Sequence, residues 1–144
     1  MAGKLLLQKF QHDEPSWRKE LSEEKQQKWF EWMQGLYQLE DLCVARWYGF
    51  PAETVVTLHV FSDASDEGYG AVAYFATSGH PTAFVAGKSK VINPKKRPTT
   101  PRSELQGLLI STRLAGTILQ EVSEVMKIGN VVVWVDSMVV YHWV

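Results

Sequence analysis

Two largely apolar segments with the character of strands, each followed by an aspartate, constrain the fold of this chain more than any other feature of its sequence. The run 58–62 leads into Asp63, and the run 131–135 leads into Asp136. A carboxylate buried at the end of a strand is unfavourable unless another group compensates its charge. A bound cation is a natural compensation, so we expect the two strand ends to meet at one site.

The spacing of apolar residues predicts a helical leader followed by a mixed α/β domain. Residues 1–53 are predicted to form a helical connection segment, because apolar residues recur there at helical spacing. Residues 54–144 are predicted to form the second domain. Its first three strands are expected where β-branched and aromatic residues lie between turn signals, at 54–61, 69–75 and 82–88.

A helix and a fourth strand are predicted to follow. Ser103 is the expected N-cap of a helix that runs to about Val125, and residues 89–101 before it are expected to form a loop. The five apolar residues 131–135 predict a buried central strand, and Asp136 precedes another helix. The order β-β-β-α-β-α gives a mixed sheet with helices on its faces.

A third acidic residue, Glu104, lies in the first turn of the predicted helix, where it can reach the same end of the sheet. Taken alone, each acid has a simpler role as a turn former, a helix cap or a first-turn glutamate. Together, Asp63, Glu104 and Asp136 offer only oxygen ligands, which favour Mg²⁺ or Mn²⁺. Two such ions, about 3.5–4 Å apart, activate water and stabilise the leaving oxygen in phosphodiester cleavage.

Basic side chains gather in one stretch of a chain whose net charge is only -1. The stretch contains no acidic residue and suggests contact with an anionic backbone, although a solvated loop is the simpler alternative. The hydroxyls of Ser65 and Ser137 are candidates for bonds near the metals or the nucleic-acid backbone, and a turn or cap role fits each equally well. The basic residues are Lys88, Lys90, Lys95, Lys96, Arg97 and Arg102.

Two absences limit the kind of protein that this sequence describes. Cys43 is the only cysteine, which excludes an intramolecular disulfide and a cysteine-based metal site. No apolar run reaches the roughly 20 residues that a membrane span needs, and the first apolar run is too short for a signal peptide. We therefore expect an intracellular, cytoplasmic protein with no membrane partner.

Four segments in the same order resemble the connection and ribonuclease H region of BEL/Pao-type retrotransposon polyproteins. Residues 61–72 resemble the first hairpin, in which an aspartate precedes a glycine-containing turn. Residues 88–109 resemble the segment with the catalytic glutamate, and residues 134–143 resemble the strand-four aspartate with its helix. The leader resembles the connection after the reverse-transcriptase thumb at residues 3–8, Trp29, Trp32 and residues 44–46.

The resemblance implies a ribonuclease H-like fold that hydrolyses the RNA strand of RNA–DNA hybrids, with two Mg²⁺ or Mn²⁺ ions held by Asp63, Glu104 and Asp136. It implies two partners, the hybrid and the reverse-transcriptase domain of the same polyprotein, in the cytoplasm or in a virus-like particle. The family's fourth acidic residue has no counterpart before Val144, which implies a C-terminally incomplete, inactive domain with an uncovered strand edge.

Two other functions remain open. One is a connection-like or domesticated remnant that binds hybrid or supports a polymerase without cleaving the RNA. The other is an aspartic peptidase, suggested by the serines near Asp63 and Asp136, but neither aspartate begins the Asp-Thr/Ser-Gly motif that a peptidase dyad needs. Inhibition by a metal chelator, and not by a peptidase transition-state mimic, would separate the two kinds of hydrolase.

Overall fold

The computed structural model describes residues 1–13, 16, 18–51 and 53–143 of the chain. The chain divides into two compact units, Met1–Val44 and Ala45–Val144. Within the described ranges, no helix is both long enough and apolar enough to cross a membrane.

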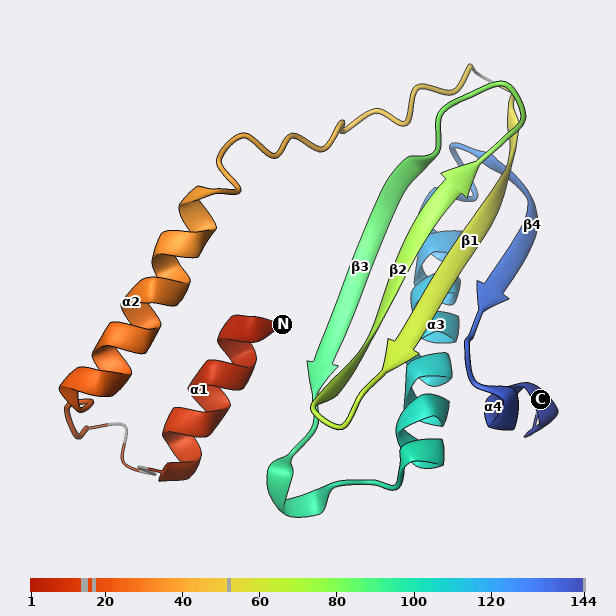
Figure 1. Cartoon of the computed structure of the whole chain (residues 1–144). Helices are drawn as coiled ribbons and strands as arrows, with labels where there is room; N and C mark the ends of the chain where they lie inside the picture. The colour runs from red at the N-terminus through yellow and green to blue at the C-terminus, as the bar shows by residue number, and fades with distance from the viewer. Residues whose placement is uncertain (14–15, 17, 52, 144) are drawn as a thin grey trace. The chain divides into compact units, whose positions relative to one another are not determined.

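The first unit contains two helices, α1 (Ala2–Asp13) and α2 (Glu23–Tyr37), which are seen in Figure 1. They meet where Gly3 of α1 lies against the indole ring of Trp32 on α2. A Cβ atom at Gly3 would lie only 2.4 Å from that ring. The close approach of the two helices therefore requires glycine at position 3.

The leader is less helical than its sequence predicts. Helix α2 ends at Tyr37, and residues 42–51 lie in no helix or strand. This irregular segment places Tyr48 and Phe50 against the hydrophobic core of the second unit. Phe50 is 7% exposed, and the ring of Tyr48 meets that of Phe75 edge to face with centroids 5.1 Å apart. Packing in the second unit therefore overrides the helical pattern here.

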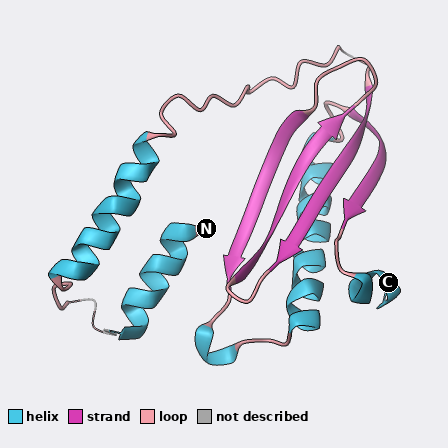
Figure 2. Cartoon of the chain, viewed as in Figure 1, coloured by secondary structure: helices cyan, strands magenta, loops and turns pink. Residues whose placement is uncertain are grey.

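The second unit contains a four-stranded sheet and two α-helices in the predicted order, β-β-β-α-β-α (Figures 1 and 2). Its elements are β1 (Val55–Ala64), β2 (Gly68–Ala76), β3 (Ala83–Val91), the 3₁₀ turn η1 (Pro94–Lys96), α3 (Thr100–Val122), β4 (Lys127–Trp134) and α4 (Met138–Trp143). The sheet order is β3-β2-β1-β4; β2 is antiparallel to both β1 and β3, and β4 is parallel to β1. The predicted mixed sheet is confirmed.

Helix α3 packs on one face of the sheet, as Figure 1 shows. Side chains alternate between the two faces of a strand, and those directed toward α3 form the core. Leu58 and Val60 on β1 and Phe75 on β2 are completely buried there, against Leu114 and Ile118 of α3. This layer fixes the sheet and α3 to each other, so residues at their ends are held on a rigid scaffold.

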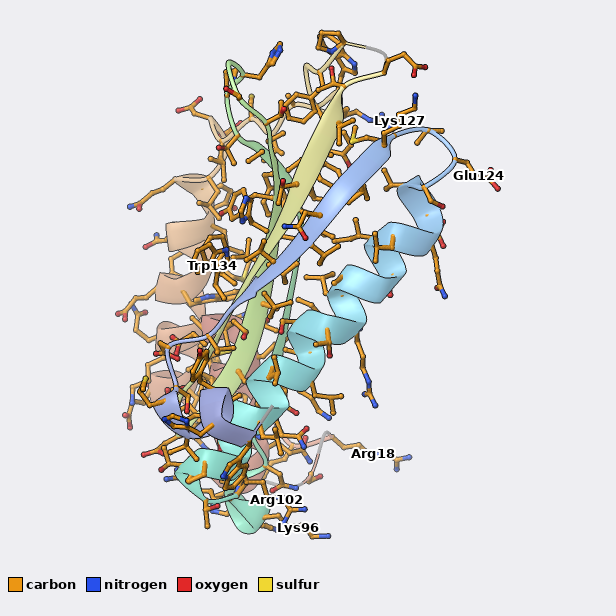
Figure 3. The ribbon with its side chains drawn as sticks, turned by 90° about the vertical axis from the view of Figure 1, so that its right-hand side faces the viewer. Arg18, Lys96, Arg102, Glu124, Lys127 and Trp134 are labelled. Carbon is orange, nitrogen blue, oxygen red and sulfur yellow. The ribbon has the colours of Figure 1, made fainter. Side chains whose placement is uncertain are left out.

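The opposite face of the sheet carries a row of aromatic rings that crosses all four strands. Trp134 on β4 stacks on Phe61 of β1, Phe61 meets Tyr74 of β2, and Tyr74 meets Phe84 of β3. Figure 3 shows Trp134 on the side of β4 away from α3. The row is partly open to solvent, because Trp134 is 49% exposed and Phe61 is 43% exposed.

Strand β4 lies at the edge of the sheet, so the prediction of a buried central strand at 131–135 is wrong. Among the described strands it pairs only with β1. A strand with one neighbour and a helix on one face keeps much of its surface in solvent, and none of the residues of β4 is fully buried. The apolar run alone does not distinguish an edge strand from a central one.

A bulge sets the register between β1 and β4. The pairing shifts between Val56 and Thr57, where Gly129 of β4 has no partner in the ladder. A Cβ atom at Gly129 would lie 2.5 Å from a valine side chain near the start of β1. Beyond the bulge the pairing is regular and ends with Phe61 opposite Trp134.

Helix α3 begins earlier than predicted. Thr99, and not Ser103, is its N-cap residue, and Pro101 lies in the first turn, where the missing amide hydrogen costs nothing. Ser103 is instead buried inside the helix, with 4% exposure. Strand β3 also continues to Val91, so the loop predicted at 89–101 contains a strand end, η1 and a helix start.

Candidate active site

The parallel pairing of β1 and β4 brings two aspartates to the same edge of the sheet. Phe61 pairs with Trp134. Asp63 follows Phe61 by two residues, within β1, and Asp136 follows Trp134 by two residues, just past the end of β4. Parallel strands end at the same edge, so these two exposed residues leave the sheet side by side.

Helix α3 brings Glu104 to this edge through a close contact with β1. A Cβ atom at Gly107 would lie 3.6 Å from the carbonyl oxygen of Asp63 and 3.7 Å from the Cβ atom of Ala64. A small residue at position 107 lets the first turns of α3 rest on the end of β1. Glu104, one turn earlier, is thereby held next to the aspartates.

The three acidic residues line one small cavity. The cavity has about 10 Å³ of space, roughly that of one water-sized sphere, so a pair of cations requires the surrounding side chains to move. The structure therefore brings together Asp63, Glu104 and Asp136, which come from three different elements. The rest of the lining consists of Ser62, Ala64, Gly107, Val135 and Ser137.

The chemistry of this cavity fits a hard divalent cation, because the polar side chains on its wall offer only oxygen atoms. In this conformation, no three histidine, cysteine or acidic side chains in the described part of the chain lie close enough to hold one ion. The carboxylate of Glu104 is bonded to a serine instead: its Oε2 atom accepts a hydrogen bond of 2.5 Å from Ser137 Oγ. Asp63 and Asp136 are exposed, and not buried at the strand ends as the sequence suggests, so they can change rotamer without displacing packed neighbours.

The two serines singled out in the sequence have different environments. Ser65 closes the turn between β1 and β2: its hydroxyl donates to the carbonyl of Gly68 over 3.1 Å and accepts from the amides of Glu67 and Gly68. Ser137 lies on the cavity wall and also caps α4, since its Oγ atom accepts from the amide of Val140 over 3.2 Å. Of the two hydroxyls, that of Ser137 contacts a predicted site residue.

The basic residues form two groups, and all of them are exposed. Four lie in the segment that runs from η1 through the first turn of α3, and Figure 3 shows Lys96 and Arg102 at the end of the domain where α3 begins. The other two, Lys88 and Lys90, lie on the edge strand β3. The sequence predicts a strand at Lys88, whereas it predicts that Lys90 lies in the loop. The first group consists of Lys95, Lys96, Arg97 and Arg102.

The sequence pattern does not predict two features of this site, the contact of Gly107 with β1 and the bond between Ser137 and Glu104. Glycine inside a helix costs about 1 kcal/mol relative to alanine, so a mid-helix glycine can mark close packing, but the sequence does not distinguish Gly107 from Gly116, which has no such contact. For the second there is no local signal, since the two residues are 33 positions apart.

A family model described as a Pao retrotransposon-like RNaseH-like domain matches residues 1–137. The match spans both compact units and includes the three acidic residues that line the cavity. A search of curated proteins found no match.

Proposed function

Because the chain belongs to the Pao retrotransposon-like ribonuclease H-like family, we propose that, within a larger polyprotein, it contributes to two-metal-ion hydrolysis of the RNA strand of RNA–DNA hybrids during reverse transcription. Membership of this family supports a nucleic-acid hydrolase role in a retrotransposon. The observation that carries the finer proposal is the convergence of Asp63, Glu104 and Asp136 on one cavity.

In this proposal the three carboxylates hold Mg²⁺ or Mn²⁺ at the cavity. When bound, such ions supply an activated water and stabilise negative charge on the leaving oxygen. The chain itself positions the residues that carry the carboxylates: Asp63 lies on β1, Asp136 lies just past the end of the adjacent strand β4, and Glu104 lies on a helix packed against β1. A fourth acidic ligand, which the family resemblance implies, would complete the set.

Contact with the substrate is proposed to come from the basic residues near the start of α3. Lys96 and Arg102 lie at the end of the domain where α3 begins (Figure 3), and Glu104 is in the same turn as Arg102. Lys88 and Lys90 on β3 would extend this contact along the sheet edge. Bonds to phosphates position a nucleic acid without reading its bases. The distinction between RNA and DNA would rest on the 2′-hydroxyl.

We also propose that residues 1–53 connect this domain to the reverse-transcriptase domain of the same polyprotein, in the cytoplasm or in a virus-like particle. The family match supports a role for the leader, because it begins at residue 1. Helix α2 supports a protein contact, because Phe30, Met33 and Leu36 are 54%, 38% and 43% exposed. Apolar side chains that recur at this spacing suit packing against a partner.

The test is cleavage of a labelled RNA–DNA hybrid in the presence of Mg²⁺, by the 144-residue chain and by a longer stretch of its polyprotein. Asp63→Asn should abolish cleavage in any active form and leave hybrid binding and folding intact. Asp66→Asn is the matched control, because Asp66 is an exposed aspartate in the β1–β2 turn outside the cavity lining. Cleavage by Asp63→Asn at the unaltered rate would exclude the proposed site.

A non-catalytic remnant is the second candidate function. The observation that favours it is the lack, in the described residues, of any group of three side chains that could hold a metal ion. Hybrid binding without Mg²⁺-dependent cleavage, in both the chain and the longer polyprotein, would support this alternative. Inhibition by a peptidase transition-state mimic, with no effect of a chelator, would instead support a peptidase.

A further inference from the structure

The hydroxyl of Ser137 makes two hydrogen bonds that together determine where its proton points. Its Oγ atom accepts from the amide of Val140 over 3.2 Å and donates to Oε2 of Glu104 over 2.5 Å. A serine hydroxyl can accept through its oxygen and donate its single proton. In Ser137 the oxygen accepts from the amide that it caps, so the proton is free to be donated to Glu104. From this geometry we propose that Ser137 is a positioning residue that sets the Glu104 carboxylate for cation binding. The inference rests on the proposed function.

Ser137 is supported by the packing of α4. Helix α4, which it caps, is anchored by Val140, a residue with 1% exposure. The main-chain carbonyl of Ser137 also accepts a hydrogen bond of 3.0 Å from the amide of Tyr141. The proton donated to Glu104 is therefore held by a packed helix end and not by a mobile side chain.

The bond has two consequences for Glu104. It uses one lone pair of Oε2, which leaves Oε1 as the oxygen with both lone pairs available to an ion. It also ties a residue of α3 to the segment that carries Asp136, the residue immediately before Ser137. A donor between the two elements offsets part of the repulsion between their carboxylates. Outer contacts of this kind typically change metal affinity by about 10–100-fold.

Glycine at position 137 separates the two roles of the serine. Ser137→Gly removes the donor to Glu104 but keeps a residue that serves well as an N-cap. Ser137→Thr keeps the donor and the cap. Ser123→Ala is the matched control, because it removes an exposed serine at the other end of α3, where the residue is the C-cap.

The measurement is calorimetric titration of the full chain with Mg²⁺, and with Mn²⁺, together with the ¹³C shift of the Glu104 carboxyl carbon in cation-free protein. Ser137→Gly should lower the affinity by about 10-fold or more, and Ser137→Thr by less than about threefold. In the cation-free protein, Ser137→Gly should move the Glu104 resonance and Ser123→Ala should not. In a Glu104→Gln background, Ser137→Gly should have no further effect on affinity, since coupled residues are not additive.

The outcomes distinguish this inference from the function on which it rests. If neither the unaltered chain nor the longer stretch of its polyprotein binds a cation, the proposed function fails and the role of Ser137 fails with it. If the unaltered chain binds but Ser137→Gly binds equally well, only the role of Ser137 is overturned. Failure of Ser137→Thr to restore affinity would likewise overturn it. If Ser137→Gly does not fold, Ser137→Ala, which also removes the donor, is compared with Ser137→Thr in folded protein, and equal Mg²⁺ affinities of the two would overturn the role of Ser137.

Discussion

The indole of Trp134 on β4 donates a hydrogen bond from its Nε1 atom to Nδ1 of His59 on β1, over 3.0 Å. The two rings also stack, with centroids 6.0 Å apart, and the indole stacks on Phe61 with an angle of 9° between the planes. Trp134 thus ties together, by side chains, the two parallel strands whose ends carry the acidic residues of the cavity.

Loss of this hydrogen bond should destabilise the domain without disrupting its fold. Trp134→Phe keeps an aromatic ring for stacking and removes the donor, so unfolding in urea should show a loss of about 0.5–1.5 kcal/mol. Trp143→Phe is the control, because Trp143 is a 63% exposed tryptophan on α4. Equal effects of the two substitutions would show that the bond to His59 does not stabilise the fold.

Substitutions at Gly107 should separate helix propensity from the contact with β1. Gly107→Ala meets Asp63 and Ala64 at ordinary van der Waals distance, so it should fold and gain up to about 1 kcal/mol from helix propensity. Gly107→Leu must push into the end of β1; overpacking of this kind typically costs about 1–3 kcal/mol, and Mg²⁺ binding should be lost.

Gly116 provides the control for these variants. It lies on the same helix, and a Cβ atom there would meet no other atom within 4 Å. Gly116→Leu should therefore gain up to about 1 kcal/mol from helix propensity and leave Mg²⁺ affinity unchanged, as measured by urea unfolding and calorimetry. If Gly107→Leu behaves like Gly116→Leu, the contact of α3 with β1 does not position the site.

Neutralising the basic residues in and just after η1 should weaken the binding of RNA–DNA hybrids by the same factor whatever the base sequence of the hybrid. Replacing Lys95, Lys96 and Arg97 with glutamine removes the positive charges that would face the phosphates. The slope of log affinity against log salt should then decrease by about 0.7–0.9 for each phosphate that is no longer neutralised. Fluorescence anisotropy with hybrids of several sequences and salt concentrations measures both effects.

Lys127→Gln tests whether hybrid binding depends on where a positive charge lies or only on the net charge of the chain. Lys127 lies at the opposite end of the domain from Lys96 (Figure 3), where it pairs with Glu53. Its removal should leave the salt slope unchanged. A decrease equal to that expected for one phosphate would mean that the segment near α3 is not a specific contact surface.

Helix α2 should lose part of its stability in acid and in strong base. A hydrogen bond and charge attraction between Lys28 Nζ and Glu24 Oε1, 2.5 Å apart, lower the pKa of Glu24 below 4.5 and raise the pKa of Lys28 above 10.5. The stabilisation from Glu24 is fully present above pH 4.5 and is lost as the pH falls through its lowered pKa. The stabilisation that Lys28 contributes is fully present below pH 10.5 and is lost as the pH rises through the raised pKa of Lys28.

Backbone chemical shifts of α2, recorded against pH, measure this effect. The effect should be small and should decrease with added salt, because both side chains are exposed. Glu24→Gln should flatten the acid limb of the titration, whereas Glu40→Gln, at an exposed residue outside the helix, should not. An acid limb that persists in Glu24→Gln would assign it to another group.

The strands and the long helix are predictable because each has a local pattern with one structural meaning. The first two strands combine β-branched and aromatic residues around the turn at residues 66–68, and their predicted bounds differ from those of β1 and β2 by only a few residues. The edge position of β4 is not predictable in this way, because burial depends on neighbours. The irregular path of residues 42–51 depends equally on distant contacts, those of Tyr48 and Phe50 with the core.

The sequence is enough to identify the acidic residues of the site, but it does not predict the geometry of their side chains. Asp63 and Asp136 stand out because each follows an apolar run. Ser65 and Ser137 look alike in the sequence, since each lies within two residues of one of these aspartates. One hydroxyl closes a turn and the other holds Glu104, and only the tertiary arrangement separates the two roles.

The bulge at Gly129, near the start of β4, determines how Asp136 is aligned with Asp63 at the other end of that strand. Side chains alternate along a strand, so a register slip of one residue exchanges the two faces. Without the extra residue at Gly129, each position of β4 after the bulge would change face relative to β1, and Asp136 would leave the sheet on the wrong side of Asp63. Deletion of a residue that has no side chain would thus be enough to separate two carboxylates that it never touches.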